Sequence, residues 1–195
     1  MCGRFALFNE RETKEIHEII RELEEKQPDS IKTGEIFPTN RVPMLVMGDE
    51  HRSVEVVTWG FPHFRGSGVI INARAETAHE KPMFRKNLAM RRCLIPSTGF
   101  YEWARENKKA RQKYLFKLSD DPVLYMAGLF NDFDGVRRFV ILTTQANESV
   151  EDIHDRMPLV VLRAELDGWL RDPHFAREIL IDQRNRPQLT RQVVV

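Results

Sequence analysis

The segment GFYEWARENKKARQKYLFKL, residues 99–118, contains two strand-like runs separated by a polar stretch. Both runs, Gly99 to Ala104 and Tyr114 to Leu118, are rich in the aromatic and apolar residues that favour strands. The stretch between them, ENKKARQ at residues 106–112, is typical of a hairpin loop. This part of the chain is therefore predicted to form an antiparallel β-hairpin.

Similar runs lie on both sides of this hairpin. Each is short and apolar or alternating, and polar, Gly or Pro residues bound it, so each is a predicted strand. The middle of the chain is thus predicted to be mainly β. The runs are Val42 to Met47, Val54 to Trp59, Val69 to Ile71, Leu124 to Phe130, Arg137 to Thr143 and Leu159 to Leu162.

Helical patterns flank the strands. Asn9 followed by Glu12 predicts a capping box that opens a helix ending before Pro28. Ala164 to Leu170 and Pro173 to Ile179 predict two short helices near the C-terminus. Together these patterns predict an α+β fold, with a curved, mostly antiparallel, barrel-like sheet and flanking helices. The apolar face of the first helix would consist of Ile16, Ile19, Ile20 and Leu23.

The length and charge of the chain limit its class. Its 195 residues suit one domain with a substantial core, and no repeat or linker divides them, so residues 1–195 are expected to form a single domain. The 30 Lys and Arg residues nearly balance 29 Asp and Glu residues, for a formal net charge of +1. This excludes binding of nucleic acid through overall positive charge, and any DNA binding must come from a local patch.

Two basic stretches could supply such a patch. The alternative for each is an ordinary solvated charged surface. The stretches consist of Arg85, Lys86, Arg91 and Arg92, and of Arg105, Lys108, Lys109, Arg111 and Lys113.

Signals for membranes, secretion, disulfides and metals are missing from the sequence. No run approaches the roughly 18 apolar residues of a membrane span, and MCGRFALF lacks the pattern of a signal peptide. A soluble cytoplasmic protein is expected. Cys2 and Cys93 are the two cysteines and lie in no Cys-x-x-Cys, which excludes a disulfide framework. No pair of the six histidines has metal-ligand spacing, so neither a cofactor nor a catalytic metal is expected.

Cys2 offers the most distinctive chemistry. Methionine aminopeptidases remove Met1 when the second side chain is small, which would leave Cys2 with a free α-amine beside its thiol. Reference pKa values of about 7.7–8.0 for the amine and about 8.5 for the thiol give both a reactive fraction at neutral pH. An aldehyde can condense with the amine to an imine, and the thiolate can then close a thiazolidine ring. The alternative is a small residue tolerated at a frayed terminus.

Three further motifs carry candidate groups. In NARAET, a strand would present Asn72 and Arg74 on one face, where an amide and a guanidinium could hold a sugar and a phosphate; the alternative is an Asn turn and a surface Arg–Glu pair. In GFYEW, Glu102 would share a face with Phe100, and desolvation would raise its pKa and suit acid–base work; the alternative is a solvent-facing Glu. In IHDRMP, His154 can carry protons near neutral pH or be structural.

Five motifs in order resemble the SOS response-associated peptidase (SRAP) family. They are MCGRF, WGF with a following aromatic, NARAET, RCLIPSTGFYEW and IHDRMP, and the resemblance spans residues 2 to about 162. It implies a β-rich fold with a positively charged groove, binding of single-stranded DNA, and a covalent crosslink between abasic sites and the N-terminal cysteine. It implies a protein that associates with the nucleoid when bound to DNA, and we expect a monomer.

The resemblance also implies a role for each motif. Cys2 would be the nucleophile, Asn72 would position the sugar, Glu102 would assist proton transfer, and His154 would assist ring opening and imine chemistry. The family name implies peptidase activity, here the self-removal of Met1, beside crosslinking and lyase activity at abasic sites. Arginines would contact phosphates and aromatic rings would stack on flanking bases; the candidates are Arg4, Arg74, Arg85 and Arg156, with Trp59 and Phe61.

One position departs from the family pattern, because Phe64 stands where a second tryptophan is usual.

Two other functions remain open at this point. One is an N-terminal-nucleophile cysteine hydrolase, in which the α-amine of Cys2 or His154 would be the base. The other is a single-stranded DNA-binding module without covalent chemistry, whose binding would survive replacement of Cys2.

Overall fold

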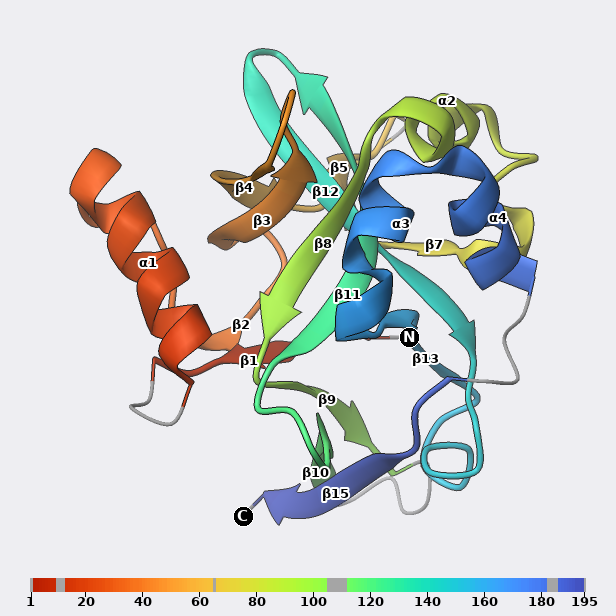
Figure 1. The fold of residues 1–195 in the computed structure, drawn as a ribbon. Helices are drawn as coiled ribbons and strands as arrows, with labels where there is room; N and C mark the ends of the chain where they lie inside the picture. Colours follow the sequence, from red (N-terminus) through yellow and green to blue (C-terminus); the bar gives the residue numbers. More distant parts are fainter. Residues whose placement is uncertain (1, 10–12, 65, 105–111, 182–185, 195) are drawn as a thin grey trace.

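The structure, a computed structural model, describes residues 2–9, 13–64, 66–104, 112–181 and 186–194. Strands form its centre and helices lie outside them (Figure 1). In chain order the elements are β1 (Phe5–Leu7), α1 (Lys14–Lys26), β2 (Gly34–Ile36), β3 (Arg41–Met47), β4 (Arg52–Trp59), β5 (Phe61–Pro62), β6 (Val69–Ile70), β7 (Asn72–Arg74), η1 (Ala75–Thr77), α2 (Pro82–Met90), β8 (Arg92–Ser97), β9 (Gly99–Trp103), β10 (Lys113–Leu118), β11 (Leu124–Phe133), β12 (Val136–Gln145), β13 (Arg156–Pro158), β14 (Val160–Val161), η2 (Arg163–Glu165), α3 (Leu166–Arg171), α4 (Pro173–Ile181) and β15 (Leu189–Val194).

Five strands pair in a closed ring. β4 pairs with β3, β3 with β8, β8 with β11 and β11 with β12, all antiparallel, and β12 returns to β4 in parallel. Closure leaves these strands without a free edge along the ring and makes the sheet a small barrel. All six residues of β8 are buried, which explains why RCLIPS shows no alternation. The predicted α+β class with a curved, mostly antiparallel, barrel-like sheet is confirmed.

A second, five-stranded sheet has the order β15-β10-β9-β1-β2, and its strands β9, β10 and β15 lie beyond one end of the barrel (Figure 1). β8 leads through Thr98 directly into β9, so the chain passes from the barrel into this sheet without a long connection. The predicted hairpin is confirmed, because β9 and β10 pair antiparallel with Phe100 opposite Phe116. Most of its loop, residues 105–111, lies outside the described residues. β1 lies between β9 and β2, inside the sheet.

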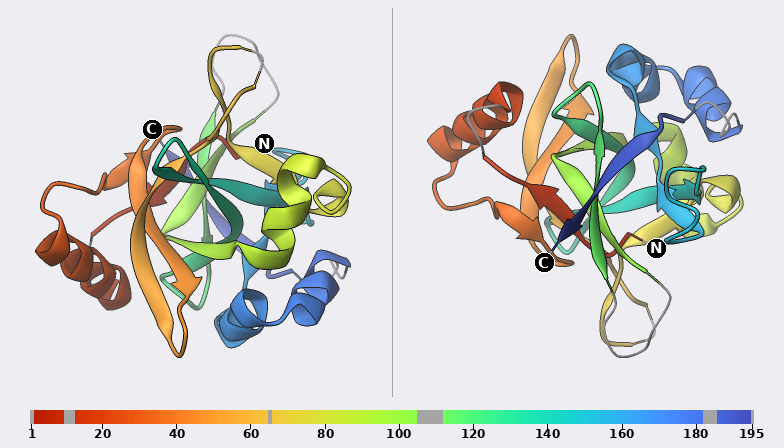
Figure 2. Two further views of the ribbon diagram at one scale, coloured as in Figure 1. Left: turned by 90° about the horizontal axis from the view of Figure 1, so that it is seen from above. Right: turned by 90° about the horizontal axis from the view of Figure 1, so that it is seen from below.

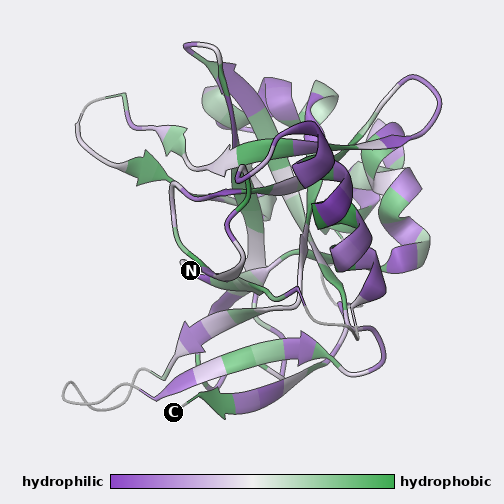
Figure 3. Cartoon of the chain, turned by 90° about the vertical axis from the view of Figure 1, so that its left-hand side faces the viewer, coloured by the Kyte–Doolittle hydropathy of each residue, from purple (hydrophilic) through white to green (hydrophobic). Residues whose placement is uncertain are grey.

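Helix α1 lies on one side of the strands, and α2, α3 and α4 lie on the other (Figure 2). The predicted apolar face of α1 is confirmed, because Ile16, Ile19, Ile20 and Leu23 are all buried. Its outward surface is hydrophilic (Figure 3). None of the described helices is long and apolar enough to cross a membrane.

The predicted start of α1 is wrong. The helix begins at Lys14 with Thr13 at the N-cap position, and no side chain among the described residues caps it. The Oδ1 atom of Asn9 instead lies 3.0 Å from Nδ1 of His17, and Glu12 lies outside the described residues. The apolar period begins only at Ile16, so the helix needs no earlier turn to bury its face.

The first basic stretch does not form one surface patch. Arg92 is 6% exposed, and its guanidinium donates hydrogen bonds to four backbone carbonyls. Burial lowers the pKa of Arg92, and the charge of Asp172 opposes this shift. Arg92 therefore joins β8 to α2 and α3 and offers nothing to DNA. The carbonyls that it binds belong to Leu88, Ala89, Trp169 and Leu170.

We predict that Arg92→Met destabilises the protein by about 3 kcal/mol, because it leaves several buried carbonyl oxygens without donors while keeping the length of the side chain. Urea unfolding measures the change. The matched control is Lys86→Ala, which removes an exposed positive charge from α2. Equal midpoints for the two variants would contradict a structural role of Arg92.

Candidate active site at the N-terminus

Cys2 is fully buried, three residues before β1. Its position follows from the pairing of β1 with β9, in which Phe5 lies opposite Phe100 and the N–H of Tyr101 donates to the carbonyl of Arg4 at 2.9 Å. The thiol of Cys2 donates a hydrogen bond to the same carbonyl, with Sγ 3.6 Å from the oxygen. The first residues of the chain are therefore held as an extension of a sheet strand.

Glu102 is the charged group coupled to this thiol. It is 4% exposed and lies two residues beyond Phe100, a core residue, so strand alternation places both on one face, as predicted. Burial raises the pKa of the Cys2 thiol well above its ordinary value, and the negative charge of Glu102 raises it further. The hydrogen bond with Arg4 and the positive charge of the chain's N-terminus, one residue before Cys2, oppose this shift only in part. The thiol is protonated at neutral pH in this form of the protein.

Asn72 reaches the same place from β7. Its Nδ2 donates a 2.8 Å hydrogen bond to the carbonyl oxygen of Cys2. Its Oδ1 is buried and has no hydrogen-bond partner among the residues that the structure describes. The structure thus brings together three of the four predicted catalytic residues, Cys2, Asn72 and Glu102, and leaves one amide oxygen available to accept a further bond.

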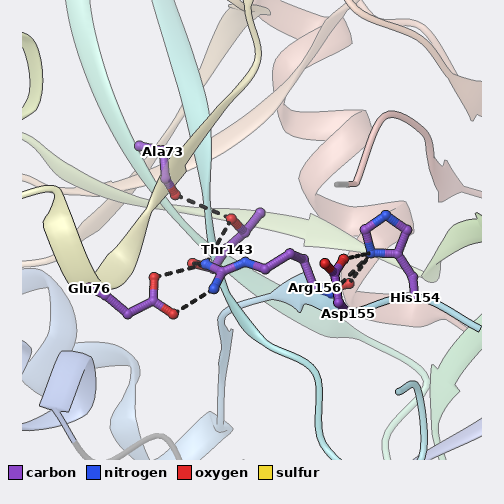
Figure 4. Close-up of polar contacts among 6 residues, drawn as sticks. All are labelled: Ala73, Glu76, Thr143, His154, Asp155 and Arg156. Carbon is purple, nitrogen blue, oxygen red and sulfur yellow. Dashed lines mark hydrogen bonds and ion pairs between the residues drawn. The ribbon is translucent and has the colours of Figure 1, made fainter. Parts of the chain in front are cut away.

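His154 lies in the turn before β13, and its side chain is 18% exposed. β7 and β13 both pair with β12, and Thr143 of β12 is in register with both Arg74 and Pro158. Asn72 and His154 therefore belong to segments held on the same part of β12. The Nδ1 atom of His154 lies 2.9 Å from the backbone nitrogen of Arg156 and 3.0 Å from Oδ1 of Asp155 (Figure 4).

The predicted phosphate-binding arginines differ in their surroundings. Arg74 is exposed at the end of β7, and Arg85 is exposed on α2. Arg85 lines a cavity of about 760 Å³ between α2 and α4, which is separate from the contacts of Cys2. The Arg156 side chain is 13% exposed and is bound to Glu76 and Thr143, so a phosphate would have to compete with these partners.

Arg4 belongs to a mixed cluster that the sequence did not indicate. Its Nη1 lies 2.9 Å from Oε1 of Glu35, and its guanidinium lies over the rings of Phe37 and Trp103, at 4.1 and 4.9 Å. Partial burial raises the pKa of Glu35, but hydrogen bonds from Lys113 and Arg4 outweigh it and keep this pKa below its ordinary value. The sequence could have suggested only that Arg4 lies next to an aromatic residue. It could not show that Glu35 and Lys113 join the cluster, because these residues are far apart along the chain.

The two aromatic residues predicted to stack on bases are core residues. Trp59 and Phe61 are both 0% exposed. The indole N–H of Trp59 donates to the carbonyl of Ile71, and its ring packs on Phe5 and Phe139. The prediction that these rings stack on DNA bases is therefore wrong. Large aromatic side chains in an apolar strand are usually buried in the core, as they are here. Phe64, by contrast, is 74% exposed.

Among the described residues, no group of three or more His, Cys, Asp or Glu side chains is arranged to hold a metal ion. The groups available at the site are a thiol, an amide, a carboxylate and an imidazole. These groups can form a covalent bond, orient a polar ligand and move protons.

Comparison with known proteins gives a consistent result. The family model of SOS response associated peptidase (SRAP) matches residues 1–193. The chain is 32% identical over 200 residues to the abasic site processing protein YoqW of Bacillus subtilis, covering 92% of this chain and 86% of the relative. It is 31% identical over 186 residues to the abasic site processing protein YedK of Escherichia coli, covering 91% and 83%.

Solved structures have the same fold. A protein from Bacteroides thetaiotaomicron is 25% identical with a TM-score of 0.77, and the match covers 100% of this chain and 92% of the other. A phage-related protein from Bordetella bronchiseptica is 25% identical with a TM-score of 0.72, covering 99% and 94%. Because the family model spans almost the entire sequence, the chain belongs to the SOS response-associated peptidase (SRAP) family.

Proposed function

We propose that this protein captures abasic sites in single-stranded DNA through a thiazolidine formed by Cys2 after Met1 is removed. The observation that carries the proposal is the convergence of Asn72 and Glu102 on the buried Cys2: one bonds its carbonyl, and the charge of the other acts on its thiol. The relatives in Bacillus subtilis and Escherichia coli are named abasic site processing proteins, which agrees with this substrate.

The proposed reaction begins at the α-amine. The amine nitrogen of Cys2 attacks the aldehyde carbon of the open abasic sugar and gives a carbinolamine. Glu102, in its acid form, protonates the departing hydroxyl, and water leaves as the C=N bond forms. The carboxylate that remains accepts the proton of the Cys2 thiol. The thiolate then adds to the carbon of this protonated imine, and the C=N electron pair goes to nitrogen, which keeps the one hydrogen that it already carries. The net change is aldehyde plus aminothiol to thiazolidine plus water.

Coupling between Glu102 and Cys2 supports this order of events. A thiol whose pKa is raised by burial is a poor nucleophile until a nearby base removes its proton. The charge of Glu102 contributes to that raised pKa, so the carboxylate lies within electrostatic range of the thiol. The free amide oxygen of Asn72 can accept a bond from the α-amine or from a sugar hydroxyl.

Intact nucleotides carry no aldehyde, so selectivity comes mainly from reactivity. The exposed Arg74 and the half-buried Arg4 would contact phosphates and position the strand. Removal of Met1 would be the self-processing step that the family name implies, and strand cleavage at the abasic site would be a further lyase activity.

We predict that Cys2→Ala abolishes the adduct with an oligonucleotide that contains one abasic site but leaves noncovalent binding. Denaturing electrophoresis and intact mass measure it, and the parent adduct should have the summed masses of protein without Met1 and DNA, less one water. Cys2→Ser is the matched control, because it keeps the α-amine and the size of the side chain but can form only an imine or an oxazolidine, both of which hydrolyse readily. Turnover of small amides without an adduct would favour an N-terminal-nucleophile hydrolase, and binding alone would favour a noncovalent module.

We also predict that Glu102→Gln slows both formation and reversal of the adduct, by about 100-fold, because a positioned proton donor is lost. His154→Ala should still crosslink but release its DNA more slowly than the parent. A chase of preformed adduct with excess unlabelled abasic strand measures release. Normal crosslinking by Glu102→Gln, with parent-like release from His154→Ala, would contradict both roles.

Arg74→Ala should weaken binding to any single strand and reduce the slope of log affinity against log salt by about 0.7, the release expected for one lost phosphate contact. Fluorescence anisotropy at several salt concentrations measures this slope. Arg21→Ala on α1, where the side chain is 65% exposed, removes the same charge at another site and should leave the slope unchanged. A changed base preference at constant slope would instead mean that Arg74 reads bases.

A further inference from the structure

Arg156 and Glu76 form an ion pair that the sequence did not predict. Nη1 and Nη2 of Arg156 lie 2.7 and 2.8 Å from the two carboxylate oxygens of Glu76, across 80 residues of chain (Figure 4). Nη2 also donates to the carbonyl of Thr143 at 2.5 Å. Two parallel N–H···O bonds fix both the position and the plane of the guanidinium, which a single bond cannot do.

The contacts between Arg156 and Glu76 keep both side chains charged. The side chains are 13% and 33% exposed, so solvent screens them only in part. Partial burial raises the pKa of Glu76, but the hydrogen bonds and charge of Arg156 outweigh it and hold this pKa below its ordinary value. Glu76 is therefore an anion throughout the neutral range, and Arg156 stays anchored there.

This pair connects the segments that carry two proposed catalytic residues. Glu76 lies in η1, which follows β7 and therefore Asn72, while Arg156 is two residues beyond His154. β7 and β13 both pair with β12, and the Arg156 side chain reaches Glu76 past Thr143 of that strand. The ion pair thus holds η1 and the His154 turn in one arrangement.

His154 depends on the backbone of Arg156. The N–H of Arg156 donates to Nδ1 of His154 at 2.9 Å, and this bond favours the neutral tautomer in which Nδ1 accepts and the ring proton is on Nε2. Nε2 lies on the side of the ring away from Asp155 and Arg156 (Figure 4). When the ring gains a proton at Nδ1, the Asp155 carboxylate 3.0 Å away and the Arg156 carbonyl 3.2 Å away can accept it.

We propose that Glu76 is a positioning residue: by anchoring Arg156 it fixes the orientation of His154 and the neutral tautomer that keeps the ring proton on Nε2. This inference rests on the proposed function for its substrate and assigns Glu76 a task that none of the predicted site residues performs. Glu76 touches neither DNA nor the reacting atoms and acts through His154. The main role of the Arg156 side chain is then to connect Glu76 to the segment that carries His154.

A spectroscopic test needs no DNA. In the parent protein, at a pH where the imidazole is neutral, the ¹⁵N signal of Nδ1 of His154 should fall in the range of an unprotonated ring nitrogen and that of Nε2 in the protonated range. In Glu76→Ala both signals should move toward the average of two tautomers. Glu80→Ala, which removes a neighbouring carboxylate that faces His79, is the matched control and should leave the signals in place. Unchanged signals in Glu76→Ala would overturn the proposal.

The kinetic test is a double-mutant cycle on release of preformed adduct. Glu76→Ala should slow release about tenfold without weakening the binding of intact single strands, because the orientation of His154 is lost while the Arg156 side chain is freed for a phosphate. The double variant Glu76→Ala/His154→Ala should release no more slowly than His154→Ala alone, since one residue acts through the other. Additive slowing, or parent-like release from Glu76→Ala, would overturn the proposal.

Glu76→Gln covers the case in which the alanine variant does not fold. It keeps one acceptor oxygen and loses the other, so it should give a smaller shift of the same signals and a smaller delay in release. If the parent protein forms no adduct, the proposed function fails, whereas the ¹⁵N signals still decide the positioning of His154.

Discussion

The site depends on the pairing of β1 inside its sheet. Chain termini usually fray, and a reactive residue at a frayed end would meet any small aldehyde in solution. Here β1 lies between β9 and β2, Phe5 and Leu7 are fully buried, and Cys2 is held at the end of that strand. The backbone hydrogen bonds of a sheet therefore give the second residue of the chain the fixed position that an active site requires.

Strand β12 provides the second constraint. It closes the barrel by pairing with β4 and β11, and its later residues carry β7 on one edge and β13 on the other. A strand in a closed ring cannot shift its register without disturbing its neighbours, so the segments attached to it keep their relative positions. Residues distant in sequence, such as Asn72 and His154, are held to one part of the molecule by this strand.

The local sequence patterns predicted features that depend on neighbouring residues, namely secondary structure and the buried face of an element. Alternation and apolar runs predicted four of the five barrel strands, the hairpin, the buried face of α1 and the shared face of Glu102 and Phe100. They missed β8, which is buried along its whole length and shows no alternation. They could not predict contacts between distant segments. An arginine in a basic stretch looks the same whether it is solvated or, like Arg92, bonds four carbonyls in the core, and nothing near Glu76 indicates Arg156. The prediction that Trp59 contacts DNA was wrong for the same reason, because the residues that bury it, Phe5 and Phe139, lie far from it along the chain.

Burial of Cys2 bears on the persistence of the proposed adduct. A buried thiol with a raised pKa is a poor nucleophile by itself, so in the proposed reaction Glu102 would have to take its proton, and this dependence would protect the residue from nonspecific oxidation or alkylation. Condensation expels one water, and a water-poor site disfavours the reverse hydrolysis. Release then requires both water and a proton delivered to the ring, which is the step assigned to His154. The same desolvation that slows the thiol would therefore make the crosslink long-lived, and the orientation of one imidazole would set how long.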